Sequence, residues 1–445
     1  MRRFRILCLS VTAFVCIPAF GVAETDPLTL DQGVREALAR NPSIEAAEFR
    51  WAAARAAIGE ARSAWYPQLA LSAGYHRTDN PPQAFMMILN QGRLDMTDPA
   101  FDPNRPEDTG NLNLTATARY LLYDGGVRSR SVRMAARSAA LAEARRDAVR
   151  NALAFEVVRA WYGVLQSQAF VALREVTIES IEALHAAARE RFDAGATVRT
   201  DVLNLDTRLA EAQEQRIRAV NALELAVSAL NTAIGTDWLT PGRLPLEAAM
   251  PEVAPVAEPA PEAYRDRPEW RSAQLAVALA QTSLEQARGD RLPRVLAVGS
   301  LQRDGETLTD GVGSYAAGVV AEWEAFGGFR QTSAIRRALA EFQAAEAEGD
   351  AVRQRLGLEL RQAALAARDA WQRLDVSARG EISATEALRV TRDRYRAGAV
   401  EVTELLMAQS AETAARTRVL TARYDYCVAL ANLRRAQGIP LYEGE

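Results

Sequence analysis

The sequence predicts a mainly α-helical protein that also carries a small membrane-spanning β-sheet and is built from two internal repeats. Two long tracts, 107–240 and 294–439, contain no proline and are rich in Ala, Leu, Arg, Glu and Gln, which favour long helices. Segments of alternating apolar and polar residues precede the helical parts, as expected of strands. The motif RFDAGATVRTDVLN at 191–204 returns as RYRAGAVEVTELLM at 394–407, with six of fourteen positions identical.

The first 23 residues are typical of an export signal peptide. Three arginines precede the apolar run 6–20, and a small-x-small cleavage site follows at 21–23. A lipoprotein signal ending at Cys16 is the alternative, but the preceding residues do not form a lipobox. Cleavage leaves Cys427 as the only cysteine, so the exported chain can form no internal disulfide.

The composition contains few residues with catalytic chemistry. The chain has no lysine and only two histidines, His76 and His185, which excludes a Walker lysine, a Schiff-base lysine and a clustered His/Cys metal site. We expect His76 in a strand and His185 as a surface or packing residue of a helix. Basic residues are spread among acids, so no nucleic-acid partner is expected. We predict no enzyme, no catalytic residue, no metal and no cofactor.

The segments of alternation predict four strands of about ten residues. They are 68–77, 111–123, 294–302 and 314–326. Such strands suit an outer membrane, with the apolar side to lipid and the polar side to a wet lumen, or a soluble sheet with one solvated face. Export and the neighbouring long hairpins favour the membrane. Because four strands cannot close a barrel in lipid, several chains must share one.

The proline-free tracts predict two helical hairpins. Residues 127–192 as one helix would span about 100 Å, so other helices must support it in coiled-coil style. After a turn at Gly195 an antiparallel helix is expected over 201–234, and 404–437 repeats this arrangement after Gly398.

The repeat divides the chain into a first unit at 24–238 and a second at 264–445. The joint at 239–263 is rich in proline and is expected to be an extended linker. The first unit carries about 24 more residues between its strands, in 78–110, which we expect to be an external loop. Its methionines, Met86 among them, have no nearby His or Cys, so a copper site is not favoured.

Six short motifs, in order and spacing, resemble one known family over nearly the whole mature chain. They are LTLDQGVREALARNPSIEAAE at 28–48, WYPQL at 65–69, YDGG at 123–126, RPEW at 267–270, FGG at 326–328 and the duplicated turn motif. The family is that of the outer membrane efflux proteins, the TolC-like outer membrane factors.

The resemblance implies a homotrimer in outer-membrane lipid. Each chain would give four strands to a 12-stranded β-barrel, which continues into a long α-helical barrel in the periplasm. Such a protein is the passive duct of a tripartite efflux or type I secretion system. A periplasmic adaptor would join it to an inner-membrane pump, either of the resistance-nodulation-division class or driven by ATP. The cargo stays open.

The turn motif has a structural interpretation and a functional one. Structurally, Gly195 and Gly398 would end one helix with positive φ, and Thr200 and Thr403 would cap the next. By resemblance, the small residues at the two tips would contact the adaptor. These are Ala194, Gly195, Ala196, Ala397, Gly398 and Ala399.

The resemblance also implies a periplasmic gate beside these turns. Its residues would be Tyr395, its partners Asp201 and Thr200, and Glu404 in a ring at the constriction. The sequence departs from the family pattern at the gate arginine, matched by Val400, and at a second ring aspartate, matched by Met407. Arg199 and Arg396 are close enough in sequence to substitute for that arginine.

A trimeric, surface-anchored coiled-coil protein with a structural or adhesive role is the alternative from another class. It predicts one block of strands at the carboxyl terminus and no internal duplication. In this sequence strands precede helices in both halves, which favours the duct.

Overall fold

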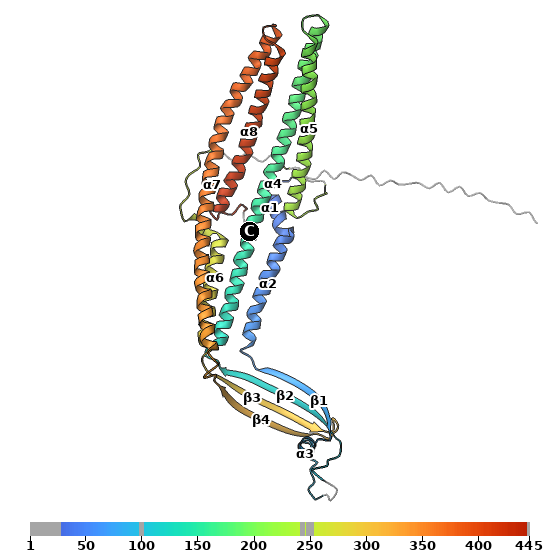
Figure 1. The fold of residues 1–445 in the computed structure, drawn as a ribbon, viewed down its shortest axis with the longest axis vertical. Coiled ribbons are helices and arrows are strands. Elements are labelled where there is room, and N and C mark those ends of the chain that lie inside the picture. The colour runs from blue at the N-terminus through green and yellow to red at the C-terminus, as the bar shows by residue number, and fades with distance from the viewer. Residues whose placement is uncertain (1–27, 98–101, 241–244, 246–252, 443–445) are drawn as a thin grey trace, which may run out of the picture.

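The computed structural model describes residues 28–97, 102–240, 245 and 253–442. The signal peptide predicted at 1–23 and much of the linker predicted at 239–263 lie outside these residues. The described chain is elongated, with a sheet at one end and two long helical hairpins at the other (Figure 1). The prediction of a mainly helical chain with four strands is confirmed.

The four strands form one antiparallel sheet in the order β1-β2-β3-β4. They are β1 (Gln68–Thr78), β2 (Thr109–Tyr123), β3 (Arg294–Gly305) and β4 (Val312–Glu322). The last strand ends earlier than predicted, because the chain turns at Trp323, whose carbonyl accepts a hydrogen bond from the Ala325 N–H at 3.1 Å.

The register separates an apolar face of the sheet from a polar one. Ala116 of β2 pairs with Leu71 and Leu301, whereas its neighbour Thr115 pairs with Ser72 and Gln302. Successive residues point to opposite faces. Leu71 remains 86% exposed, so the apolar face is uncovered in the single chain.

Two helices of 67 residues run from the sheet to the far end of the molecule. They are α4 (Val127–Asp193) and α7 (Arg330–Arg396). Near the sheet they are flanked by α2 (Pro42–Ser63) and α6 (Pro268–Gly289), and at the far end by α5 (Arg199–Ile234) and α8 (Val402–Ala436). None of the helices in the described residues is both long and apolar enough to span a membrane.

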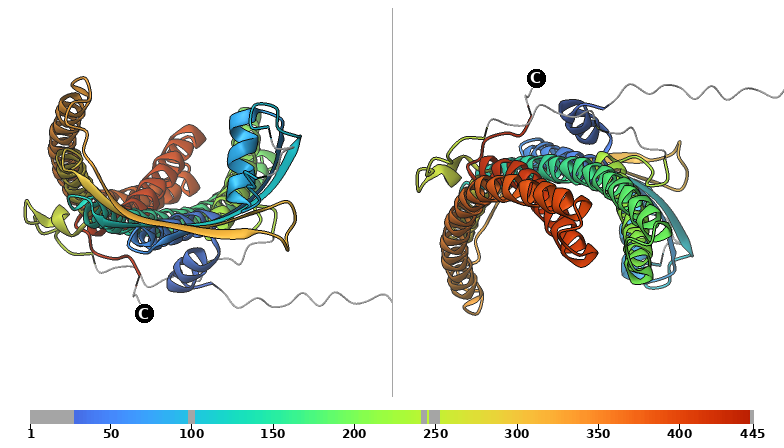
Figure 2. Two further views of the ribbon diagram at one scale, coloured as in Figure 1. Left: turned by 90° about the horizontal axis from the view of Figure 1, so that it is seen from below. Right: turned by 90° about the horizontal axis from the view of Figure 1, so that it is seen from above.

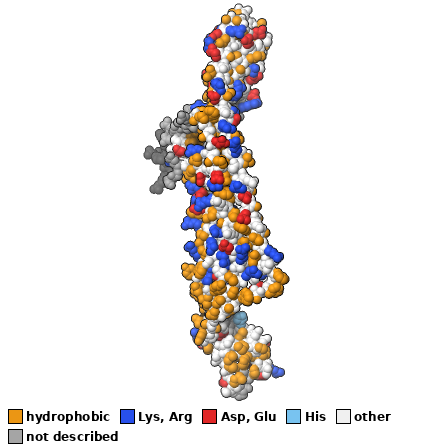
Figure 3. All heavy atoms as spheres, turned by 90° about the vertical axis from the view of Figure 1, so that its left-hand side faces the viewer, with side chains coloured by type: hydrophobic (Ala, Val, Ile, Leu, Met, Phe, Trp, Pro, Cys, Tyr) orange, Lys and Arg blue, Asp and Glu red, His pale blue; other side chains and the backbone are white. Residues whose placement is uncertain are grey.

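A core at mid-length joins the helices. Trp161 and Val157 of α4 are fully buried beside Leu230 of α5 and Cys427 of α8, and the short helix α1 (Leu30–Arg40) packs on the same cluster. Figure 3 shows the contrast along one face: apolar side chains gather over the sheet and the adjoining helix ends, while charged side chains cover the hairpins.

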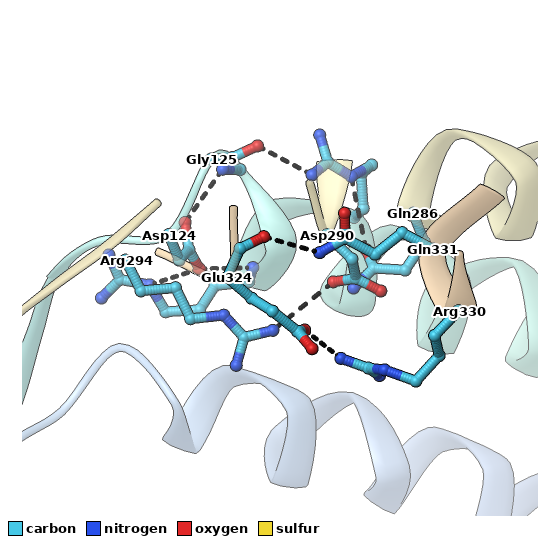
Figure 4. A network of polar contacts seen from close by, with 11 residues as sticks. Asp124, Gly125, Gln286, Asp290, Arg294, Glu324, Arg330 and Gln331 are labelled. Carbon is cyan, nitrogen blue, oxygen red and sulfur yellow. Dashed lines mark hydrogen bonds and ion pairs between the residues drawn. The ribbon is translucent and has the colours of Figure 1, made fainter. Parts of the chain in front are cut away.

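A polar network connects the sheet to the helices (Figure 4). The Asp124 carboxylate accepts hydrogen bonds from the backbone N–H of Gly126 at 2.9 Å and of Arg128 at 2.7 Å. Burial acts to raise the pKa of Asp124, but these hydrogen bonds and the Arg128 charge hold it below its ordinary value. On the other side of the network, Glu324 pairs with Arg330 at the start of α7. These hydrogen bonds and this ion pair therefore fix the junction between the sheet and the long helices.

The loop between β1 and β2 contains a helix that the sequence did not predict, α3 (Pro81–Asn90). It lies at the end of the sheet away from the long helices (Figure 1). Its proline start suits the first turn of a helix, where the missing N–H costs nothing.

Candidate functional site at the hairpin tips

The two hairpin tips share one backbone conformation. Gly195 has φ of 72° and Gly398 of 74°. The Ala196 N–H donates to the Arg191 carbonyl at 2.8 Å and the Gly195 N–H to the Phe192 carbonyl at 2.9 Å; the second tip repeats this pair. This is the Schellman ending, which places glycine where a Cβ would be strained. The structural prediction for both glycines is confirmed.

The predicted N-caps are wrong. Helix α5 begins at Arg199 and α8 at Val402, so Thr200 and Thr403 lie inside the first turn. The threonine that serves the turn is Thr197, whose hydroxyl donates to the Asp201 carboxylate. Asp201 and Glu404 do lie in the first turns, where a carboxylate is favourable against the helix dipole.

Tyr395 lies between the two hairpins and is only 5% exposed. Its hydroxyl has no hydrogen-bond partner among the described residues. Burial raises the pKa of Tyr395, and the charge of Asp201 raises it further against the opposing effect of Arg191. Among the described residues, no hydrogen bond joins the Tyr395 hydroxyl to Asp201. The surrounding apolar residues come from four helices: Leu184, Ala188, Leu205, Leu388, Val402, Leu405 and Leu406.

Arg191 connects the first hairpin to Tyr395, a contact that the sequence analysis missed. Its Nη1 donates to the Tyr395 carbonyl at 2.7 Å, and its guanidinium lies 5.0 Å from the centroid of the tyrosine ring. The equivalent arginine of the second repeat, Arg394, instead pairs with Glu404 at 3.4 Å. Both members of that second pair are more than half exposed, so solvent screens it.

The positions that depart from the family pattern differ in environment. Val400 is half-buried and packs against the Tyr395 cluster, whereas Met407 is 69% exposed. The side chains of Arg199 and Arg396 make no hydrogen bond or ion pair with any described residue. In the single chain, Arg191 is the arginine that contacts Tyr395.

Farther from the tips, polar contacts join α4 to the second hairpin. Arg392 Nη2 donates to Ser180 Oγ at 3.3 Å, and Ser180 Oγ donates to Gln409 Oε1 at 3.2 Å. The contacts line a groove of about 750 Å³ between the hairpins. His185 lies on the other side of α4, with its Nε2 2.8 Å from Asp206 of α5.

In the end-on view the second tip lies inside the arc that the helices form (Figure 2). Among the described residues, no group of three or more His, Cys, Asp or Glu is placed to hold a metal ion. The family described as outer membrane efflux protein matches residues 33–236 and 260–439. This chain belongs to that family.

Relatives and solved structures extend over most of the chain. Protein CyaE of Bordetella pertussis is 30% identical over 422 residues, covering 92% of this chain and 84% of CyaE. The alkaline protease secretion protein AprF of Pseudomonas aeruginosa is 25% identical over 429 residues, covering 93% and 85%. The open state of the MtrE outer membrane channel of Neisseria gonorrhoeae has the same fold, with a TM-score of 0.76 at 21% identity, covering 93% of this chain and 89% of MtrE.

Membership of the outer membrane efflux protein family confirms the predictions of location and general function. The chain is an outer-membrane export channel protein, and the family is one of channels rather than enzymes. Proteins of this family work with periplasmic adaptors and inner-membrane pumps.

Proposed function

We propose that three copies of this chain form one passive export duct. The single observation that carries the proposal is the curved, unclosed wall seen end-on in Figure 2, in which helices and sheet follow one arc. Strands β1 and β4 are the two edges of the sheet, and unpaired edges are not tolerated in lipid. Pairing β4 of one copy with β1 of the next would close a twelve-stranded barrel from three copies, with the apolar face toward lipid.

The hairpin tips are proposed as the contact surface for the adaptor. Residues 194–196 and 397–399 are small and exposed at both tips. Their Schellman turns fix the backbone, so a partner can approach it closely without ordering a flexible loop. The residues proposed to contact the adaptor are Ala194, Gly195, Ala196, Ala397, Gly398 and Ala399.

The cargo is proposed to be a secreted polypeptide, delivered by an ATP-driven pump. AprF, which is similar over 93% of this chain, is named for the secretion of a protease. Efflux of small molecules is the second candidate, favoured by the family's own description. Identifying the pump that co-purifies with the chain separates the two, since a resistance-nodulation-division pump would exclude the polypeptide.

The gate is proposed to close through the second hairpin. Tyr395, buried among side chains of α4, α5, α7 and α8, would be its central side chain, with Asp201 and Thr200 of α5 as its partners. Glu404 from three chains would ring the throat and favour cations. Arg191 joins this set because it holds the Tyr395 carbonyl.

Single-channel recording in planar bilayers tests the proposal. The double variant Tyr395→Phe, Asp201→Ala is expected to conduct more than the wild type. Unchanged conductance contradicts the gate, whereas absence of conductance steps in both proteins contradicts the duct itself.

A further inference from the structure

Helix α3 exposes apolar side chains although it lies over the polar face of the sheet. Ala84 is fully buried, whereas Met86 is 50% exposed and Leu89 is 44% exposed. With Pro82, which is also exposed, they form a stripe at spacings of four and three residues, one side of a helix. Such a stripe is unfavourable facing water and is not covered by its own chain.

Buried polar contacts fix the position of α3 on the sheet. Gln91, which ends the helix and is 2% exposed, donates from Nε2 to the Gly110 carbonyl at 2.7 Å and to Asn111 Oδ1 at 2.9 Å. Asn111 in turn donates to Asp304 Oδ1 at 2.7 Å. Asp304 is 3% exposed and also accepts from Asn113 at 2.9 Å, so the anchor reaches β2 and β3.

The register identifies which face of the sheet carries this anchor. Asn111 and Asn113 alternate with Leu112 and Leu114, which belong to the apolar face, and Asn113 pairs with Asp304. The anchor is therefore on the polar face. In the end-on view, α3 lies on the concave side of the arc (Figure 2). In a closed barrel that side is the lumen.

The dimensions of a twelve-stranded barrel leave little room for three such helices. Strands about 4.8 Å apart and tilted by about 40° give a circumference of about 75 Å and a backbone diameter of about 24 Å. A helix is about 10 Å across, and three placed against the wall fill this cross-section. Their exposed stripes would then meet near the axis.

We propose that the α3 helices of three copies of this chain contact one another through Met86 and Leu89 and constrict the mouth of the duct remote from the hairpin tips. This inference rests on the proposed trimeric duct. The occupant of the apolar stripe is a second copy of the same helix. The duct then has two constrictions in series, one at each end, and the narrower one limits conductance.

Cross-linking of the full-length protein tests the contact. Leu89→Cys is treated in membranes with a short bifunctional maleimide, and Leu308→Cys is the control. Leu308 is 68% exposed in the turn between β3 and β4, at the same end of the sheet. A cross-linked dimer is expected for Leu89→Cys but neither for Leu308→Cys nor for the parent, whose Cys427 is buried. Equal cross-linking of the two variants overturns the proposal.

Conductance provides an independent readout that needs no cysteine. Met86→Ser combined with Leu89→Ser should change little while the hairpin gate is closed. In the Tyr395→Phe, Asp201→Ala background it should raise conductance by about two-fold or more, as loss of an apolar constriction rewets the pore. No rise in that background contradicts the α3 contact. If the wild type itself gives no conductance steps, the proposed duct is what fails.

Discussion

Replacing Arg191 with glutamine removes the cation that reaches from α4 to Tyr395. The lost contacts are one charged hydrogen bond at 2.7 Å and one cation–π contact at 5.0 Å. Such contacts contribute about 1.5–3 and about 0.5–1 kcal/mol. Because Arg191 is only half-buried, we discount their sum to about 1–2 kcal/mol for each chain. In the proposed gate, this would shift the balance toward the open state by about 5–30-fold per chain.

The assay is the fraction of time that single channels spend in the high-conductance state in planar bilayers. Arg189→Gln is the matched control, because it removes the same charge two residues away from an exposed position. Arg191→Lys retains the charge but loses the planar group, so it should lie between the wild type and Arg191→Gln. The reasoning is refuted if Arg191→Gln and Arg189→Gln give the same open fraction.

Three further outcomes follow from single sites. Gly398→Ala should lower stability by about 1 kcal/mol in thermal unfolding, because φ is 74° there, whereas Gly357→Ala inside α7 should not lower it. Arg267→Met should cost about 1–3 kcal/mol in urea unfolding, since Glu269 and Glu359, which are 29% and 35% exposed, lose a cation that is 3% exposed, while the exposed Arg265→Met should change stability by less than about 0.5 kcal/mol. Burial raises the pKa of the Cys427 thiol to about 11, above the value of about 8.5 expected when unfolded. The contribution of Cys427 to the unfolding free energy is therefore constant below pH 8.5 and falls from there to pH 11, so the loss of stability over this range should be smaller in Cys427→Ala.

Most of the architecture follows from periodicity and from the positions of proline. The alternation at 111–123 determined a strand and its two faces, since a strand with one buried or lipid-facing side must repeat every two residues. The absence of proline allowed α4 and α7 to run without interruption. Helix α3 was not predicted because ten residues are too few for a helical period to be recognised. The segment also lies within 78–110, which was interpreted as an external loop because of its extra length. Its position depends on Gln91 and Asp304, which are 213 residues apart in sequence.

The turns of the candidate site were predictable from the sequence, but the contacts between the two hairpins were not. Glycine in Ala-Gly-Ala indicates positive φ from local chemistry alone. The N-cap prediction was wrong because a threonine before an acidic residue also fits the first turn of a helix, which is where Thr200 lies. The contact between Arg191 and Tyr395 spans 204 residues and depends on how two hairpins pack, which no local pattern encodes. The available signal was an arginine at the first position of the motif in both repeats, Arg191 and Arg394. The sequence does not indicate which of the two contacts the other hairpin.

The two tips show how a repeat places equivalent residues in different environments. Phe192 and Tyr395 hold the same position in the two motifs, yet Phe192 is 39% exposed and Tyr395 is 5% exposed. The cause is the packing of α8 against α4, which places the second tip inside the arc and leaves the first on the wall (Figure 2). Arg191 of the first hairpin therefore contacts the backbone carbonyl and the ring of Tyr395 in the second hairpin. A tyrosine at position 192 would lie on the exposed first tip, so the contact between Arg191 and Tyr395 depends on this packing and not on the motif alone.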